Sequence, residues 1–163
     1  MPKVILKLGD DVSTDIIYPG RFMATVLPTE TPQFAFADDS QFNAKLKAKE
    51  VSPGSIIAAG KNFGCGSSRE QAVSCLKGHE LTIIARSFAR IFLQNSINLG
   101  LRTLVCPGLE ASEADDLQLS ETLIQNETTG RLFAIVPLPK SRQAIIDAGG
   151  LIAYTRKRLL ASA

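Results

Sequence analysis

The chain has 163 residues, of which 45% are hydrophobic and 21% are charged, and its formal net charge is +2. This length fits one domain with a single core, and the weak, scattered charge argues against a nucleic-acid-binding protein. No apolar run reaches the roughly 18 residues of a transmembrane helix, and the first residues lack the apolar stretch of a signal peptide. We therefore expect a cytoplasmic protein that does not contact membranes.

The chain has few cysteine and histidine side chains that could bind a metal. The three cysteines, Cys65, Cys75 and Cys106, form no C-x-x-C pair, and His79 is the single histidine. This set is too small for a zinc site, and its spacing does not match iron–sulfur ligands. We expect no metal site in this chain, and we expect its thiols to be reduced.

The first third of the chain predicts two strands separated by a long loop. Val4–Leu8 is a short apolar run that indicates a strand. Turn-forming residues dominate from there to about residue 38, which predicts a long loop of the kind that often carries function. A weak helical pattern over 41–49 and a buried strand over Ser55–Ala59 follow.

Beyond a glycine-rich loop, the second part of the chain alternates between strands and helices. The expected elements are helix 68–76 with Gly78 as its cap, strand 81–85, helix 87–99, strand 102–105, a hairpin of strands 121–125 and 131–137, and closing helices 141–147 and 151–159. The alternation predicts βαβ units with right-handed connections. We therefore expect a single α/β domain over residues 1–163, with a mixed sheet.

The most informative segment is Gly60–Gln71, which reads Gly-Lys-Asn-Phe-Gly-Cys-Gly-Ser-Ser-Arg-Glu-Gln. Its glycine-rich turn and the start of a helix would offer unpaired N–H groups to an anion. Arg69 would add a planar, bidentate cation that suits a carboxylate or phosphate. Because the segment follows a strand, it lies where ligands of parallel sheets usually bind. These residues predict an anion-recognition loop.

A simpler interpretation of the same segment needs no ligand. Ser67 with Glu70, and Ser68 with Gln71, each match the capping-box pattern of a helix N-terminus. The segment taken alone leaves both interpretations open.

Three segments together resemble the small subunit of the two-subunit, aconitase-type hydro-lyases, the isopropylmalate dehydratase family. They are residues 9–21 (GDDVSTDIIYPGR), 60–70 (GKNFGCGSSRE) and 85–101 (ARSFARIFLQNSINLGL). Their order and separations also match, and the resemblance spans the chain from Lys3 to about Arg158. It implies a swivelling β/β/α domain, equivalent to the mobile fourth domain of single-chain aconitases.

The resemblance also implies a partner. A large subunit would carry a [4Fe–4S] cluster, and this chain, which has no cofactor of its own, would be active only with that subunit. The substrate would be a small di- or tricarboxylate, such as the 2- and 3-isopropylmalate that are interconverted in leucine biosynthesis. Assembly of several heterodimers into a larger oligomer stays open, and no nucleic-acid partner is expected.

Residue by residue, Ser67 matches the serine base of the family, which removes a proton from carbon. Ser68 and Arg69 match residues that hold substrate carboxylates. The supporting residues expected around them are Thr14, Asp15, Gly64 and Gly66. The first two lie in the Thr-Asp segment of the family, where they either brace the loop or touch the substrate.

Met23, Ala24 and Thr25 lie where the resemblance places recognition of the variable group of the substrate. This stretch has no positive charge, so a distal carboxylate would be desolvated there without a partner, whereas an alkyl group such as isopropyl fits.

Two departures from the family pattern keep other substrates open. Gln71 stands where many relatives have histidine, and residues 26–38 do not follow the pattern of the leucine-pathway enzymes. Citramalate and 2,3-dimethylmalate therefore stay open as substrates, and homoaconitate is the least favoured. A stand-alone module that binds an anion such as phosphate is the alternative from another functional class.

Overall fold

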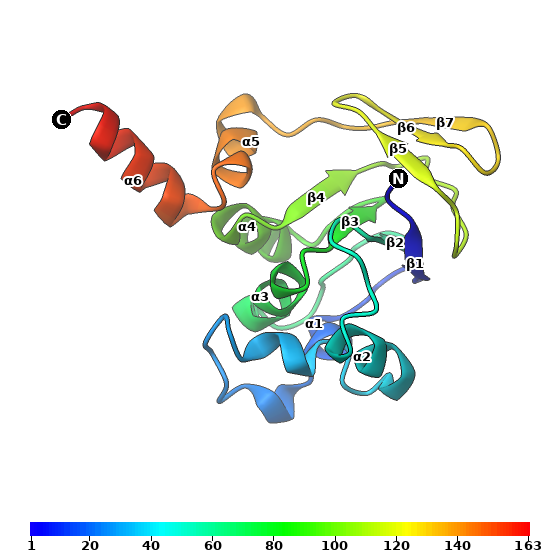
Figure 1. The fold of residues 1–163 in the computed structure, drawn as a ribbon, viewed down its shortest axis with the longest axis horizontal. Helices are drawn as coiled ribbons and strands as arrows, with labels where there is room; N and C mark the ends of the chain where they lie inside the picture. Colours follow the sequence, from blue (N-terminus) through cyan, green and yellow to red (C-terminus); the bar gives the residue numbers. More distant parts are fainter.

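A four-stranded parallel sheet forms the centre of the computed structural model, which describes residues 1–163 (Figure 1). Its strands are β1 (Val4–Lys7), β2 (Ile56–Ala59), β3 (Thr82–Ala85) and β4 (Arg102–Val105), in that order across the sheet. Each strand pairs in parallel with the next strand of the chain, so the helices in between serve as crossover connections.

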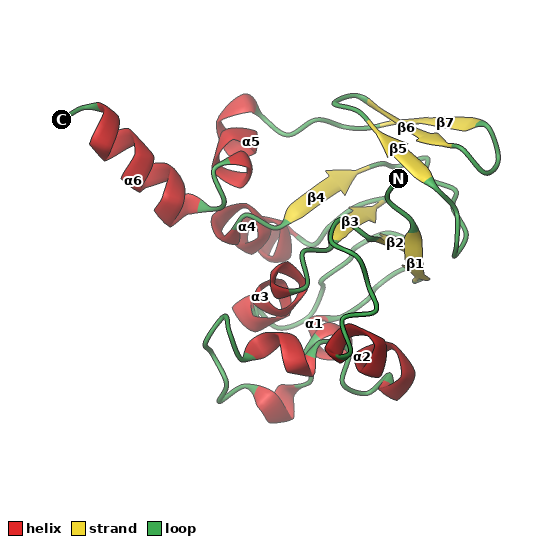
Figure 2. Ribbon diagram, viewed as in Figure 1, coloured by secondary structure: helices red, strands yellow, loops and turns green.

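A layer of helices covers one face of this sheet (Figure 2). Its members are α1 (Thr14–Ile17), the 3-10 helices η1 (Gly20–Phe22) and η2 (Thr31–Phe34), α2 (Ser40–Lys47), α3 (Glu70–Gly78) and α4 (Arg90–Leu99). Two C-terminal helices follow, α5 (Lys140–Asp147) and α6 (Leu151–Ala161). Helix α5 packs on α4, whereas α6 buries no side chain and projects from the body of the molecule (Figure 1).

A second, antiparallel sheet lies on the opposite face of the parallel sheet. Its strands are β5 (Leu117–Leu119), β6 (Leu123–Asn126) and β7 (Arg131–Ala134), in that order. Isolated bridges join its chain segment to the two outer strands of the parallel sheet, from Asp116 to Lys3 beside β1 and from Val136 to Val105 of β4.

The pleat of β2 and β3 explains the three layers. Successive side chains of a strand point to opposite faces of the sheet. Ile57 and Ile83 therefore pack among the helices, while Ile56 and Ile84 pack against the antiparallel sheet. Every residue of both strands is buried, as expected for parallel strands that are covered on both sides. The order of layers is antiparallel sheet, parallel sheet, helices, which is the β/β/α arrangement that the resemblance implied.

Most of the predicted elements are confirmed to within two or three residues, including the four parallel strands, the hairpin and the closing helices. The expected mixed sheet is divided into two sheets that the isolated bridges connect. The short helices between residues 14 and 34, and strand β5, were not predicted, because they contain too few residues to show a period.

The helix after β3 begins three residues later than predicted. The helix was expected from Ser87, and α4 begins at Arg90. The preceding residues pair instead with the loop after β2, because the Ala89 N–H donates to the Phe63 carbonyl and the Phe63 N–H to the Ser87 carbonyl. This pairing draws the start of α4 toward the loop that carries Ser67.

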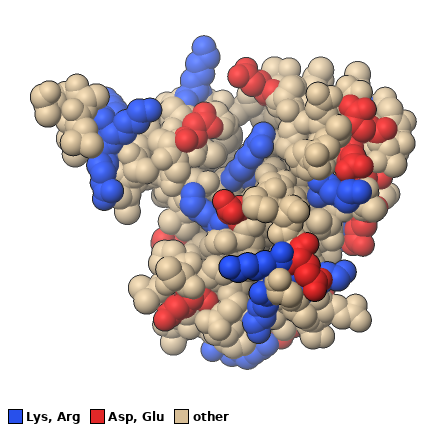
Figure 3. Space-filling model, viewed as in Figure 1, with Lys and Arg blue, Asp and Glu red and all other residues tan.

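Basic and acidic side chains are interspersed over the face of the molecule in Figure 3. The basic run Arg156–Arg158 lies on the projecting helix α6. None of the helices is both long and apolar enough to cross a membrane.

Candidate active site

Two loops meet at the carboxyl end of the parallel sheet, one after β1 and the other after β2. Backbone hydrogen bonds join them along their length. The Gly64 N–H donates to the Val12 carbonyl at 2.7 Å, and the Thr14 N–H donates to the Cys65 carbonyl at 2.9 Å. The two segments with Thr-Asp and Gly-Ser-Ser-Arg, some 50 residues apart in the sequence, therefore form one structure.

Glycine is required at both predicted supporting positions of the second loop. Gly64 and Gly66 have φ of +84° and +86°, a region that residues with a Cβ adopt at a cost. Gly64 is also buried against the ring of Phe92, which a Cβ atom would overlap. The loop consequently turns twice in three residues and leaves its amides exposed.

The backbone N–H groups of residues 65–71 donate no hydrogen bond within the chain. The same is true of residues 90–92, the first turn of α4. Unpaired amides at a turn and at helix N-termini carry partial positive charge and attract anions. The predicted anion-recognition loop is thus rich in free donors, and α4 brings further donors to its side.

The two serines of the loop are exposed, and their hydroxyls make no hydrogen bond in the structure. Helix α3 begins at Glu70, with Arg69 in an extended conformation and no side chain capping the helix. The capping-box interpretation was therefore wrong. The loop is held in another way, because the buried Thr14 hydroxyl donates to the carbonyl oxygen of Ser67 at 2.7 Å.

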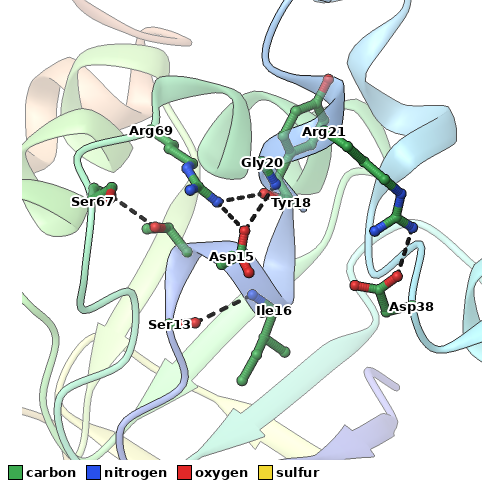
Figure 4. Close-up of polar contacts among 10 residues, drawn as sticks. Ser13, Asp15, Ile16, Tyr18, Gly20, Arg21, Asp38, Ser67 and Arg69 are labelled. Carbon is green, nitrogen blue, oxygen red and sulfur yellow. Dashed lines mark hydrogen bonds and ion pairs between the residues drawn. The ribbon is translucent and has the colours of Figure 1, made fainter.

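Arg69 is oriented by two oxygens of the first loop (Figure 4). Its Nη1 donates to Asp15 Oδ1 at 2.6 Å and to the Tyr18 carbonyl at 3.1 Å. The Arg69 side chain is only 15% exposed, against 63% for Asp15, so the guanidinium lies sunk between the two loops. Its Nε and Nη2 make no hydrogen bond within the chain and remain available to a ligand.

The ionised form of Asp15 is favoured by these contacts. The hydrogen bond from Arg69, followed by the N–H of Gly20 at 2.8 Å, lowers the pKa of the Asp15 carboxyl below its ordinary value of 3.8. A carboxylate that stays charged keeps its hydrogen bond to the Arg69 guanidinium and so keeps that planar group in one orientation.

Six of the predicted site residues line one cavity of about 320 Å³ between the second loop and α4. They are Thr14, Gly64, Gly66, Ser67, Ser68 and Arg69. Asn62, Arg90 and Asn95 also line this cavity, although the sequence pattern did not place them in the site. A larger open groove beside β1 and α2, of about 800 Å³, contains none of the predicted residues.

Met23, Ala24 and Thr25 do not line the cavity. They directly follow η1, and Met23 is 39% exposed. Side-chain donors hold this stretch from both sides: the Tyr18 hydroxyl bonds the carbonyls of Phe22 and Thr25, and Gln71 bonds the carbonyl of Met23. The structure thus connects these three residues to the site through their backbone.

Tyr18 and Gln71 were not predicted as parts of the site. No signal in the sequence could have shown their contacts with the 22–25 segment, because Gln71 and Met23 are 48 positions apart. The pairing of Asp15 with Arg69 was missed for the same reason, although each residue had been named.

The cysteines lie apart from one another. Cys75 and Cys106 belong to the two separate cores, and Cys65 is a half-buried residue of the cavity wall. No group of three or more His, Cys, Asp or Glu side chains is arranged to hold a metal ion.

Comparisons with known proteins agree with this geometry. Residues 11–108 match the family model described as the aconitase C-terminal domain. The chain is 44% identical over 156 residues to the 3-isopropylmalate dehydratase small subunit of Methanosarcina mazei, with 93% of each chain covered. It is 43% identical to the isopropylmalate/citramalate isomerase small subunit of Methanocaldococcus jannaschii, over 97% of this chain and 95% of that one. A crystal structure of 3-isopropylmalate dehydratase from M. jannaschii superposes with a TM-score of 0.87 at 37% identity, covering 98% of this chain and 95% of that one.

Proposed function

Because the chain belongs to the aconitase C-terminal domain family, we propose that it is the small subunit of a hydro-lyase that interconverts 2- and 3-isopropylmalate. The relatives that carry this subunit name match almost the whole chain, which supports the assignment and its place in leucine biosynthesis. The observation that carries the proposal is the cavity in which free serine hydroxyls, unpaired amides and an oriented guanidinium face the same space.

Arg69 and Ser68 bind a carboxylate of the substrate in this proposal. The free Nε and Nη2 of Arg69 form a fork that matches the two oxygens of a carboxylate. Asp15 and the Tyr18 carbonyl occupy Nη1 and so keep the fork turned in one direction. A rigid, charge-assisted pair of this kind fixes the carbon skeleton before the reaction begins.

Ser67 is the base that takes the proton from carbon during dehydration and returns a proton during rehydration. Dehydration breaks the C–H bond, with its proton going to Ser67 Oγ, while the hydroxyl leaves the adjacent carbon. A serine acts in this way only as its alkoxide, which needs strong local stabilisation. The unpaired amides of residues 65–71 and the guanidinium of Arg69 supply positive potential for that charge.

A large partner subunit completes the active site. When bound there, its [4Fe–4S] cluster would supply the Lewis acid for the leaving hydroxyl. The cysteines of this chain lie in separate places and do not fit such a cluster. We take residues 1–163 as one swivel domain that docks on that subunit in the cytoplasm, a reducing compartment that suits three free thiols.

Isopropylmalate is the proposed substrate because Met23, Ala24 and Thr25 offer no cation to a distal carboxylate and because the relatives are named for it. Citramalate is the second candidate, since one relative at 43% identity is named for both compounds. Homoaconitate would place a carboxylate beside the apolar segment without a partner, and the desolvation of an unpaired ion costs several kcal/mol.

Co-expression with the cognate large subunit tests the proposal. The heterodimer should hydrate and dehydrate isopropylmalate, while this chain alone should not. Ser67→Ala should lower kcat by about 10²- to 10⁴-fold, the usual contribution of an acid–base group, without separating the subunits. Ser141→Ala is the matched control, because Ser141 is exposed at the start of α5, far along the chain from the site. Wild-type turnover by the Ser67→Ala heterodimer would contradict the assignment.

Calorimetry on the isolated chain separates this function from a stand-alone anion-binding module. Half of an active site should bind dicarboxylates weakly at best, and inorganic phosphate no better. Tight binding of phosphate, lost in Arg69→Ala, would support the binding module instead.

A further inference from the structure

The backbone of residues 22–25 is held by side chains from two sides. At the end of α1, the hydroxyl of Tyr18 lies 3.1 Å from the Phe22 carbonyl oxygen and 3.2 Å from that of Thr25. A phenol has one proton, so this donor is shared between the two carbonyls. From α3, the Gln71 Nε2 donates to the Met23 carbonyl at 3.1 Å. Three of the four carbonyls in this segment are thereby held.

The Tyr18 side chain is a rigid support. It is fully buried, and its ring packs edge-to-face with Phe22 and Phe34, which stack on each other at 4.1 Å. Burial raises the pKa of the Tyr18 hydroxyl above its ordinary value of 10.0, so the hydroxyl stays protonated and remains a donor. The neighbouring Arg21–Asp38 pair is exposed and contributes less to this rigidity.

The same two residues connect the segment to the carboxylate-binding arginine. Gln71 is two positions after Arg69 at the start of α3, and Arg69 itself donates to the carbonyl of Tyr18. The segment and the guanidinium are therefore fixed relative to each other by hydrogen bonds that all start or end on Tyr18, Arg69 or Gln71. Within residues 22–25, the side chains of Met23 and Ala24 are exposed, whereas those of Phe22 and Thr25 are half-buried.

We propose that Tyr18 and Gln71 are positioning residues that set which alkyl substituent the enzyme accepts, by fixing residues 22–25 at a set distance from Arg69. This inference rests on the proposed function. The segment does not line the cavity, but hydrogen bonds through Tyr18 and Gln71 connect it to Arg69. In the proposed function the substrate is held at its carboxylate by Arg69 with its substituent toward this segment, and a fixed segment gives a bulky isopropyl group a defined surface. A methyl group reaches that surface less and depends on it less.

Two variants that remove only a hydrogen-bond donor test the proposal in the reconstituted heterodimer. Tyr18→Phe keeps the ring and loses the hydroxyl, and Gln71→Met keeps the length of the side chain and adds no charge. Each should lower kcat/KM for 3-isopropylmalate by about 3- to 10-fold, the usual effect of one lost hydrogen bond, and leave kcat/KM for citramalate within about twofold. The double variant should fall short of the product of the single effects, because both residues hold one segment.

The controls are Tyr154→Phe on α6 and Gln94→Met on α4, a glutamine whose side chain bonds only Asn98 of its own helix. Both should keep the ratio of the two kcat/KM values. Equal losses with both substrates, or an unchanged ratio in both test variants, would overturn the positioning role. A wild-type heterodimer that turned over neither substrate would overturn the proposed function and this inference with it.

Discussion

Replacement of Arg69 by lysine is the sharpest single test of the site. The guanidinium has five N–H donors in a fixed plane, and its Nη1 is committed to Asp15 and the Tyr18 carbonyl. The Nε and Nη2 donors then face a ligand as a fork. A lysine ammonium has three donors on one atom, so it cannot hold Asp15 and present a parallel pair at the same time.

The size of the effect follows from that count. Arg69→Lys should keep the positive charge and one contact to the carboxylate, and it should lose one charge-assisted hydrogen bond. Such a bond contributes about 1.5–3 kcal/mol, which corresponds to a fall in kcat/KM of about 10- to 150-fold. Loss of the second contact weakens binding in the ground state, so KM should rise. The single remaining contact also orients the substrate less well for the reaction, so kcat should fall.

The assay is the reconstituted heterodimer with 3-isopropylmalate, followed by the absorbance of the unsaturated dicarboxylate. Arg142→Lys on α5 is the control, because Arg142 is exposed and lies outside the cavity. Equal kcat/KM for the wild type and Arg69→Lys, with intact heterodimers, would refute the assignment of the fork to a carboxylate.

Three further predictions concern the two loops. The pKa of Asp15 is lowered below its ordinary value of 3.8, so its carboxylate is ionised and paired with Arg69 at neutral pH, and the pairing is lost only as the pH falls through the lowered pKa. Asp15→Asn should therefore reduce activity without changing the shape of the pH–rate profile between about pH 5 and 9. Gly64→Ala should lower the free energy of unfolding, measured by urea titration, by about 1–3 kcal/mol, because it adds a clash with Phe92 to the strain of a positive φ. Gly54→Ala has the same strain but open space around the new Cβ, so it should cost less. An aromatic disulfide reagent should titrate Cys65 alone in the native chain and all three thiols after denaturation; rapid reaction of a buried thiol would contradict the packing.

Most of the individual strands and helices could be predicted from the sequence because their signals are local, whereas the β/β/α layering was implied only by the family resemblance. The apolar run of β2, the glycine loop after it and Gly100 at the end of α4 each mark an element within a few residues, and Gly100 indeed has a φ of +75°. The division into two sheets has no such signal. It depends on which faces of β2 and β3 meet the hairpin, and this is decided by packing.

The sequence named six residues that the structure brings together in one cavity, but it did not show the contacts that hold them. A Ser-x-x-Glu pattern has the same letters whether the serine caps a helix or stays free, and the decision comes from Thr14, which holds the Ser67 carbonyl from the other loop. The orientation of Arg69 likewise comes from Asp15, 54 positions away. Tertiary contacts of this separation override the local pattern, so the start of α3 was placed two residues too early.

The bridges at the two outer strands of the parallel sheet have a consequence for handling the isolated chain. An uncovered outer strand offers a row of unpaired amides and carbonyls on which another chain can add, and aggregation often begins in this way. Here Asp115 pairs its backbone with Val4 on one edge, and Val136 pairs with Val105 on the other. One segment, residues 114–136, thus pairs with both outer strands, which should disfavour the addition of another chain at these points.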